Sequence, residues 1–186
     1  MQENLQRILS NWKFYRSHTL DFLEILTEEE ICYKLPRPDL DTFGKHFLEM
    51  GEVQKAYIKA LETGKIDFSV GNYDQPEIYK KKIKLRAHFK KMDDYMVNVL
   101  KGIKDVNREI DWGLGKENPN VLEHLQFLIQ HEILHHGQLV AFAYLFNLPI
   151  PESIVTTWAF PLNETQEMQL KRRMNLIKNE TKTNLR

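Results

Sequence analysis

Apolar side chains recur at every third or fourth position over four long stretches of the chain, which is the spacing of an amphipathic helix. These stretches cover about residues 4–26, 42–63, 76–103 and 119–147. Prolines and glycines separate them, because neither residue favours a helix interior. Thr42 is suited to cap the second stretch. The pattern therefore predicts four long helices.

The fourth stretch differs from the others because it is apolar nearly all round. Its apolar side chains include Leu125, Phe127, Leu128, Ile129, Ile133, Leu134, Leu139, Val140, Phe142, Leu145 and Phe146. A helix without a polar face is buried on more than one side. In a single bundle this predicts a second packing surface on that helix, and so a homodimer formed through it.

The C-terminal part of the chain follows a different pattern. Residues 148–161 hold three prolines and Trp158, and we expect an ordered crossing segment there. Asn163, with Gln166 three residues later, resembles a capping box that opens a fifth helix reaching about residue 179.

No stretch shows the alternation of a strand, so the expected fold class is all-α. The simplest architecture is an up-down-up-down four-helix bundle with an additional C-terminal helix. We expect a single domain over residues 1–186, with the core bundle at about 4–147 and the crossing segment and last helix at 148–180.

Composition narrows the class of function. Lys plus Arg and Asp plus Glu each number 26, and a chain with no net charge lacks the basic surface of a nucleic-acid binder. Cys32 is the only cysteine, which excludes a disulfide within the chain and a zinc site built on cysteines. No signal peptide and no run of about 18 apolar residues is found, so we expect a cytoplasmic protein that does not enter the membrane.

The histidines are the strongest candidates for metal ligands in this sequence. His131 and His135 are four residues apart in the fourth helix, so both imidazoles leave the same face one turn apart. His46 lies on the inward stripe of the second helix. Three imidazoles with open positions left for water and substrate are typical of a catalytic metal site. The alternative is that these histidines are hydrogen-bonded core residues without a metal.

Three further side chains near this pattern are candidates for catalysis. The sequence from His131 to His135 also reads H-E-x-x-H, in which Glu132 would be the general base of a zinc metallopeptidase. The longer form of that motif is absent, and we regard a peptidase as the weaker alternative. Glu49, three residues after His46, and Gln138, one turn after His135, could transfer a proton or form hydrogen bonds near the ion.

The combination resembles a known family. A histidine early in the second helix, followed by His131-x-x-x-His135-His136-Gly137-Gln138 and then Leu148-Pro149-Ile150-Pro151, is similar to the DinB-like (DinB/YfiT) superfamily of metal-binding four-helix bundles. The resemblance implies an up-down-down-up or related bundle, a frequent homodimer, and a divalent metal held by His46, His131 and His135. Known members include thiol-dependent transferases and isomerases.

These observations lead to two hypotheses. The first is a metal-dependent enzyme acting on a small molecule, with zinc or nickel as the expected metal. With a low-molecular-weight thiol as nucleophile it would be an S-transferase, which the resemblance favours, and with water it would be a hydrolase. The second is a non-catalytic dimeric bundle in which the metal or the histidines only stabilise the fold.

Overall fold

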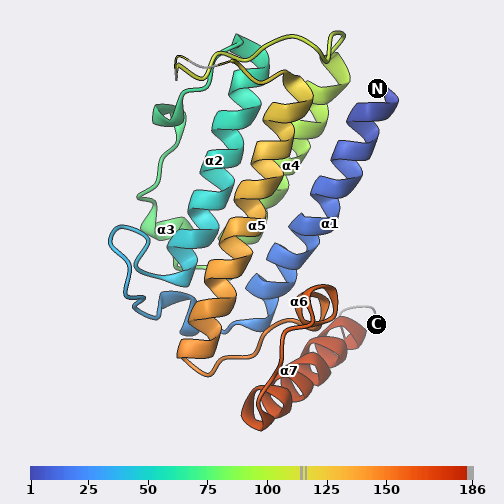
Figure 1. Ribbon diagram of the computed structural model, residues 1–186. Coiled ribbons are helices and arrows are strands. Elements are labelled where there is room, and N and C mark those ends of the chain that lie inside the picture. The colour runs from blue at the N-terminus through green and yellow to red at the C-terminus, as the bar shows by residue number, and fades with distance from the viewer. Residues whose placement is uncertain (114, 116, 184–186) are drawn as a thin grey trace.

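The computed structural model describes residues 1–113, 115 and 117–183. Within these residues the structure is helical and contains no β-strand, which confirms the all-α fold class. The elements are α1 (Glu3–Ile25), η1 (Glu30–Cys32), α2 (Phe43–Thr63), η2 (Phe68–Val70), α3 (Pro76–Tyr79), α4 (Lys82–Gly102), α5 (Val121–Leu145), α6 (Glu152–Trp158) and α7 (Glu164–Thr183). The long helices α1, α2, α4 and α5 lie side by side as a bundle (Figure 1).

The ends of α2 lie where the sequence places them. The Thr42 hydroxyl accepts a hydrogen bond from the backbone N–H of Lys45 and so caps the first turn. At the other end Gly64 has a φ of 81°, a left-handed conformation that glycine adopts without strain. The predicted helix over residues 42–63 is therefore confirmed.

The third predicted helix is broken into α3 and α4. Lys81 between them has an extended backbone, with φ −136° and ψ 114°. The break lets the carbonyl of Tyr79 pack directly on Gly44 of α2, where a Cβ atom would lie only 1.9 Å from the carbonyl oxygen. The Glu28 carboxylate accepts a hydrogen bond from the backbone N–H of Lys82, one of the first N–H groups of α4, which have no partner within the helix.

Two capping boxes open the later helices. Asn120 and Glu123 exchange side-chain to backbone hydrogen bonds at the start of α5. Asn163 and Gln166 do the same before α7, which confirms the expected capping box there. The crossing segment that precedes it contains one short helix, α6, that the sequence pattern did not predict.

The order of helix directions differs from the up-down-up-down expectation. Glu52 of α2 contacts His88 of α4, and further along both helices Glu62 contacts Tyr95. Because the residue numbers of the contacting pairs increase along both helices together, α2 and α4 run in the same direction. Residues 64–81 run back along α2 between them, so the directions are those of an up-down-down-up bundle (Figure 1).

A polar layer divides the core of the bundle at mid-height. One apolar cluster surrounds Phe22, Phe47 and Leu139, and the other surrounds Trp12 and Leu125. Between them the four long helices place polar side chains at one level, namely Arg16, His18, Thr19, His46, Glu49, Glu52, Gln54, His88, Asp93, Glu132, His135 and His136. Buried polar groups are costly unless they are paired, so this layer is where a function is expected.

The helices α6 and α7 pack at the end of the bundle where α1 finishes (Figure 1). Arg173 of α7 holds this contact: it donates to the carbonyl of Ile25 at 2.7 Å and pairs with both carboxylate oxygens of Glu30. Among the described residues, no helix is long and apolar enough to cross a lipid bilayer.

Candidate metal centre

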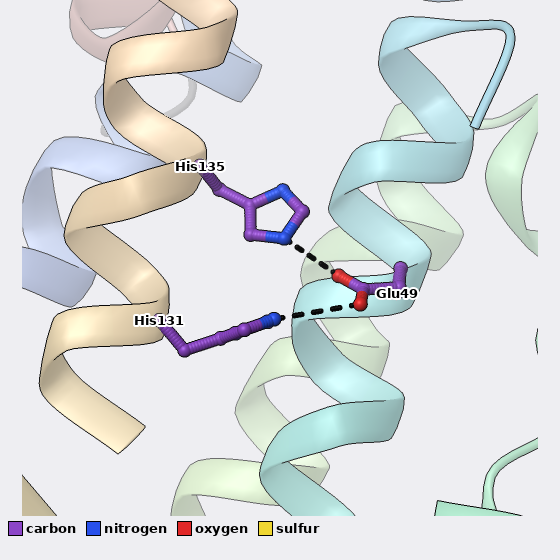
Figure 2. A group of neighbouring side chains, drawn as sticks. All are labelled: Glu49, His131 and His135. Carbon is purple, nitrogen blue, oxygen red and sulfur yellow. Dashed lines mark ion pairs between the residues drawn. The ribbon is translucent and has the colours of Figure 1, made fainter. Parts of the chain in front are cut away.

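Glu49 of α2 faces His131 and His135 of α5 across the polar layer (Figure 2). The Nε2 atom of His135 lies 2.8 Å from Oε2 of Glu49, and the Nε2 atom of His131 lies 3.4 Å from Oε1. One ligand atom from each residue falls within 4.8 Å of the other two. These three side chains therefore form a group that could hold a metal ion.

The regular helices explain why these side chains meet. His131 and His135 are one turn apart and their ring centroids lie 4.6 Å apart on one face of α5. His46 and Glu49 are likewise about one turn apart on α2. Because α2 and α5 are antiparallel, the pair on one helix comes to lie opposite the pair on the other.

Glu49 is ionised in this setting. Burial alone would raise the pKa of its carboxyl group, but the contacts with the imidazoles of His131 and His135 outweigh burial and lower the pKa to about 2. The site thus holds one fixed negative charge at neutral pH.

His46 lies on the far side of His135 from Glu49. The Nδ1 atoms of the two rings are 3.2 Å apart, and their centroids are 5.3 Å apart. Burial, followed by the charges of His135 and Arg37, lowers the pKa of His46 to about 3, so its ring is neutral. A neutral imidazole is the form that binds a metal.

The structure thus brings His131 and His135 together as predicted, with Glu49 between α2 and α5 as their partner. His46 contacts His135, and its role as a ligand stays a prediction. The side chains of His131 and Glu49 remain 20% and 19% exposed, so solvent reaches this side of the group.

The polar atoms that lack partners fit a bound cation. Among the described residues, the buried atoms without a hydrogen-bond partner include Oε2 of Glu49, which faces His135, and Nε2 of His46. Such atoms carry a free-energy cost unless a ligand satisfies them. Imidazole nitrogens and a carboxylate are a donor set that suits zinc, nickel, iron or copper.

Glu132 does not join this group. Its carboxylate points toward α1, where it pairs with Nη1 of Arg16 at 3.1 Å and accepts a hydrogen bond from Thr19. The side chain is fully buried, and burial, only partly offset by Arg16, raises its pKa. This position, on another face of α5 from His131, does not suit the general base of a peptidase.

The polar layer continues from Glu132 into a network that the sequence did not reveal. Arg16 is buried between the rings of Trp12 and Phe89, and it donates to Gln54. The hydroxyl of Thr19 lies 2.7 Å from Nε2 of His136. His136 is therefore a buried member of this network.

Gln138 lies at the edge of the centre. Its Oε1 accepts a hydrogen bond of 2.5 Å from Nη1 of Arg37, a residue of the loop before α2. No spacing rule connects a loop arginine to a helix 101 residues later, so only the two prolines that flank Arg37 set it apart in the sequence.

Two comparisons with known proteins bear on this geometry. The model of one protein family, described as the DinB family, matches residues 1–145, which hold the four long helices and all the candidate ligands. A search of curated proteins finds no match.

Proposed function

Because the chain belongs to the DinB family, we propose that it is a metal-dependent enzyme in which His131 and His135 of α5, with donors from α2, hold a divalent cation. On α2 the donors are Glu49, which already faces both rings, and His46, the predicted third imidazole. The observation that carries the proposal is the convergence of Glu49, His131 and His135 in a layer of mostly buried polar side chains.

We further propose zinc or nickel as the metal and a low-molecular-weight thiol as the nucleophile. A divalent metal lowers the pKa of a thiol or water bound to it and so supplies a nucleophile at neutral pH. In a thiol transfer the sulfur forms the new bond to carbon, the leaving group departs with its electron pair, and the thiol proton passes to solvent. The family favours the thiol over water.

The chain's own residues prepare the site for this chemistry. Glu49 holds a negative charge beside the two rings, and that charge attracts a cation. The contact between His46 and His135 fixes the orientation of the second ring. The side chains of His131 and Glu49 are partly exposed where we expect a small substrate to approach, and the rings of His46 and His135 are buried beside them.

Metal titration tests the premise. Purified protein should take up one zinc or nickel ion per chain, measured by elemental analysis, and His131→Ala should take up none. The loaded protein is then given chlorodinitrobenzene with a thiol, or nitrophenyl acetate without one. Thioether formation that needs the metal supports the transferase, and ester hydrolysis alone supports the hydrolase.

The non-catalytic alternative is separated by a chelator. If the metal only stabilises the bundle, its removal unfolds the chain, which circular dichroism would show. An apoprotein that keeps its helices and regains thiol transfer on adding metal supports the enzyme. Failure of the wild-type chain to bind any of these ions would overturn the proposal.

A further inference from the structure

Arg37 sits on a tightly built turn in the loop that precedes α2, near the metal centre. Pro36 and Pro38 flank it and each fixes its own φ angle. The N–H of Arg37 donates to the carbonyl of Leu35 at 2.8 Å, and the N–H of Leu40 donates to that of Pro38 at 2.7 Å. Since Leu35 is anchored in the core, the turn presents the arginine from a fixed backbone.

The guanidinium of Arg37 lies beside the imidazoles. Its Nη1 donates to Gln138, which follows His135 by three residues and so lies one turn further along α5. Its positive charge also contributes to the low pKa of His46, after burial and His135. The arginine thus reaches the same end of the centre as the His46–His135 contact.

This positive charge has no counter-ion within the described part of the chain. The nearby carboxylate of Asp41 is already paired with Lys34 and Lys45, the latter at 2.8 Å. The hydrogen bond to Gln138 is to a neutral amide, and it engages one of the five N–H groups of the guanidinium. The guanidinium of Arg37 therefore has further N–H groups that could donate hydrogen bonds to a ligand.

A bound divalent ion would add positive charge close to the unpaired guanidinium of Arg37 and so raise the electrostatic free energy of the site. The ion brings two positive charges, of which Glu49 offsets one, and the guanidinium adds another close by. Like charges at short range repel, so the loaded site favours a ligand that carries negative charge. One guanidinium fork matches one carboxylate in shape and charge, which favours a carboxylate over a dianionic phosphate.

We propose that Arg37 is a substrate-binding residue that holds the carboxylate of a small molecule while another group of that molecule reaches the metal centre. The inference rests on the proposed metal site and names the class of its ligand, a small carboxylic acid. The carboxylate belongs either to the thiol or to the electrophile, and the two sources are distinguished by the test.

The test uses protein loaded with cobalt, whose absorption reports a bound thiolate or carboxylate. Mercaptoacetate and mercaptoacetamide share a thiol and have nearly the same size, but the first carries a carboxylate where the second carries a neutral amide. The wild-type protein should bind mercaptoacetate about tenfold to a hundredfold more tightly, and Arg37→Gln should bind both alike. Arg86→Gln is the matched control, because Arg86 pairs with Glu24 away from the site and the preference should persist.

A second arm compares acetate with acetamide. If the preference for the anion, lost in Arg37→Gln, is found here and not with the thiols, the carboxylate is that of the electrophile. Gln138→Ala removes the tether of Arg37 but keeps its charge, so it should keep the preference. An arginine that only ties its loop to α5 would leave the preference for the anion unchanged in Arg37→Gln, and both variants would lower the melting temperature alike.

The outcomes separate the two proposals. A chain that takes up no cobalt overturns the metal site and this inference with it. A chain that loads cobalt but shows no preference for either anion, or keeps that preference in Arg37→Gln, overturns the role of Arg37 and leaves the metal site standing.

Discussion

The Nδ1 atoms of His46 and His135 lie 3.2 Å apart, which means that one of them donates a hydrogen bond and the other accepts it. The other nitrogen of His135 faces a carboxylate oxygen of Glu49 at 2.8 Å, and a carboxylate only accepts. A proton on Nε2 of His135 would face this carboxylate and would leave Nδ1 of His135 to accept from Nδ1 of His46. Nε2 of His46 is buried and has no hydrogen-bond partner among the described residues.

His46 and Glu49 contact opposite nitrogens of His135, so each can be tested by its own substitution. His46→Ala and Glu49→Gln should each weaken zinc binding about tenfold to a hundredfold, because each removes one donor or the group that orients His135. Isothermal titration of the metal-free proteins measures the change. His88→Gln is the control, since His88 is buried in the same layer but faces Glu52.

The comparison also decides whether the third imidazole is a ligand. If His46→Ala binds zinc as tightly as the wild-type chain while Glu49→Gln does not, the prediction of His46 as a ligand is wrong and Glu49 takes its place. Equal binding by both variants and the wild type would contradict the α2 side of the site altogether.

The helices were predictable because their signals are local. The spacing of apolar residues and the caps at Thr42 and Asn163 depend on neighbours a few residues away, and the structure confirms them. The direction of α4 was not predictable in this way. It depends on residues 64–81 returning along α2, and the close approach of Tyr79 to Gly44 that fixes this path joins residues distant in sequence.

The candidate site was predictable to the same extent. The pair His131 and His135 follows from helical spacing alone, whereas the partner that faces it depends on how α2 is rotated. Neither Arg37 nor Arg16 could be singled out from the sequence, because arginines in loops and helices usually lie at the protein surface. Only the packing shows that Arg16 is buried and that Arg37 bonds to Gln138.

The position of Glu132 predicts a structural role for it. Glu132→Gln leaves the buried guanidinium of Arg16 without its closest carboxylate, and breaking a buried pair in this way costs about 3 kcal/mol. Urea unfolding should show this loss, with zinc binding by the folded variant unchanged. The control is Glu24→Gln, which breaks the exposed pair with Arg86 and should cost less than about 1 kcal/mol.

A peptidase predicts the opposite pattern for the same variant. Casein hydrolysis by the wild-type protein that is lost in Glu132→Gln, without loss of stability, would contradict the structural role. It would then require Glu132 to turn from Arg16 toward the metal, which the fully buried carboxylate disfavours.

The outer face of α5 supports the expected homodimer. Phe127, Leu134 and Leu145 are 40%, 58% and 63% exposed, and their spacing of seven and eleven residues places them on one side of the helix. If two copies pack through this face, Leu134→Lys should convert a dimer into a monomer in analytical ultracentrifugation. Ile83→Lys, at a more exposed site on α4, should leave the dimer intact. A wild-type chain that is monomeric at high micromolar concentration would contradict the dimer.

His124 makes the stability of the fold depend on pH. Its Nε2 donates to the carbonyl of Tyr57 at 2.9 Å and its Nδ1 accepts from Trp112 at 3.1 Å, so the buried ring is neutral with both nitrogens satisfied. Burial lowers its pKa to about 4, although the bond to Tyr57 opposes this. Below about pH 6.5 the unfolded chain takes up a proton there that the folded chain refuses until about pH 4.

The free energy of unfolding should therefore fall as the pH is lowered from 6.5 to 4, by about 3 kcal/mol from this residue alone. Urea unfolding at a series of pH values, with a chelator present to exclude metal, measures the slope. Burial also lowers the pKa of His46 and His136, so these rings steepen the slope in the same direction. His124→Gln cannot take up a proton at this position, so the unfolding free energy of this variant should depend less steeply on pH, by the contribution of one proton. A variant with the wild-type slope would contradict this account.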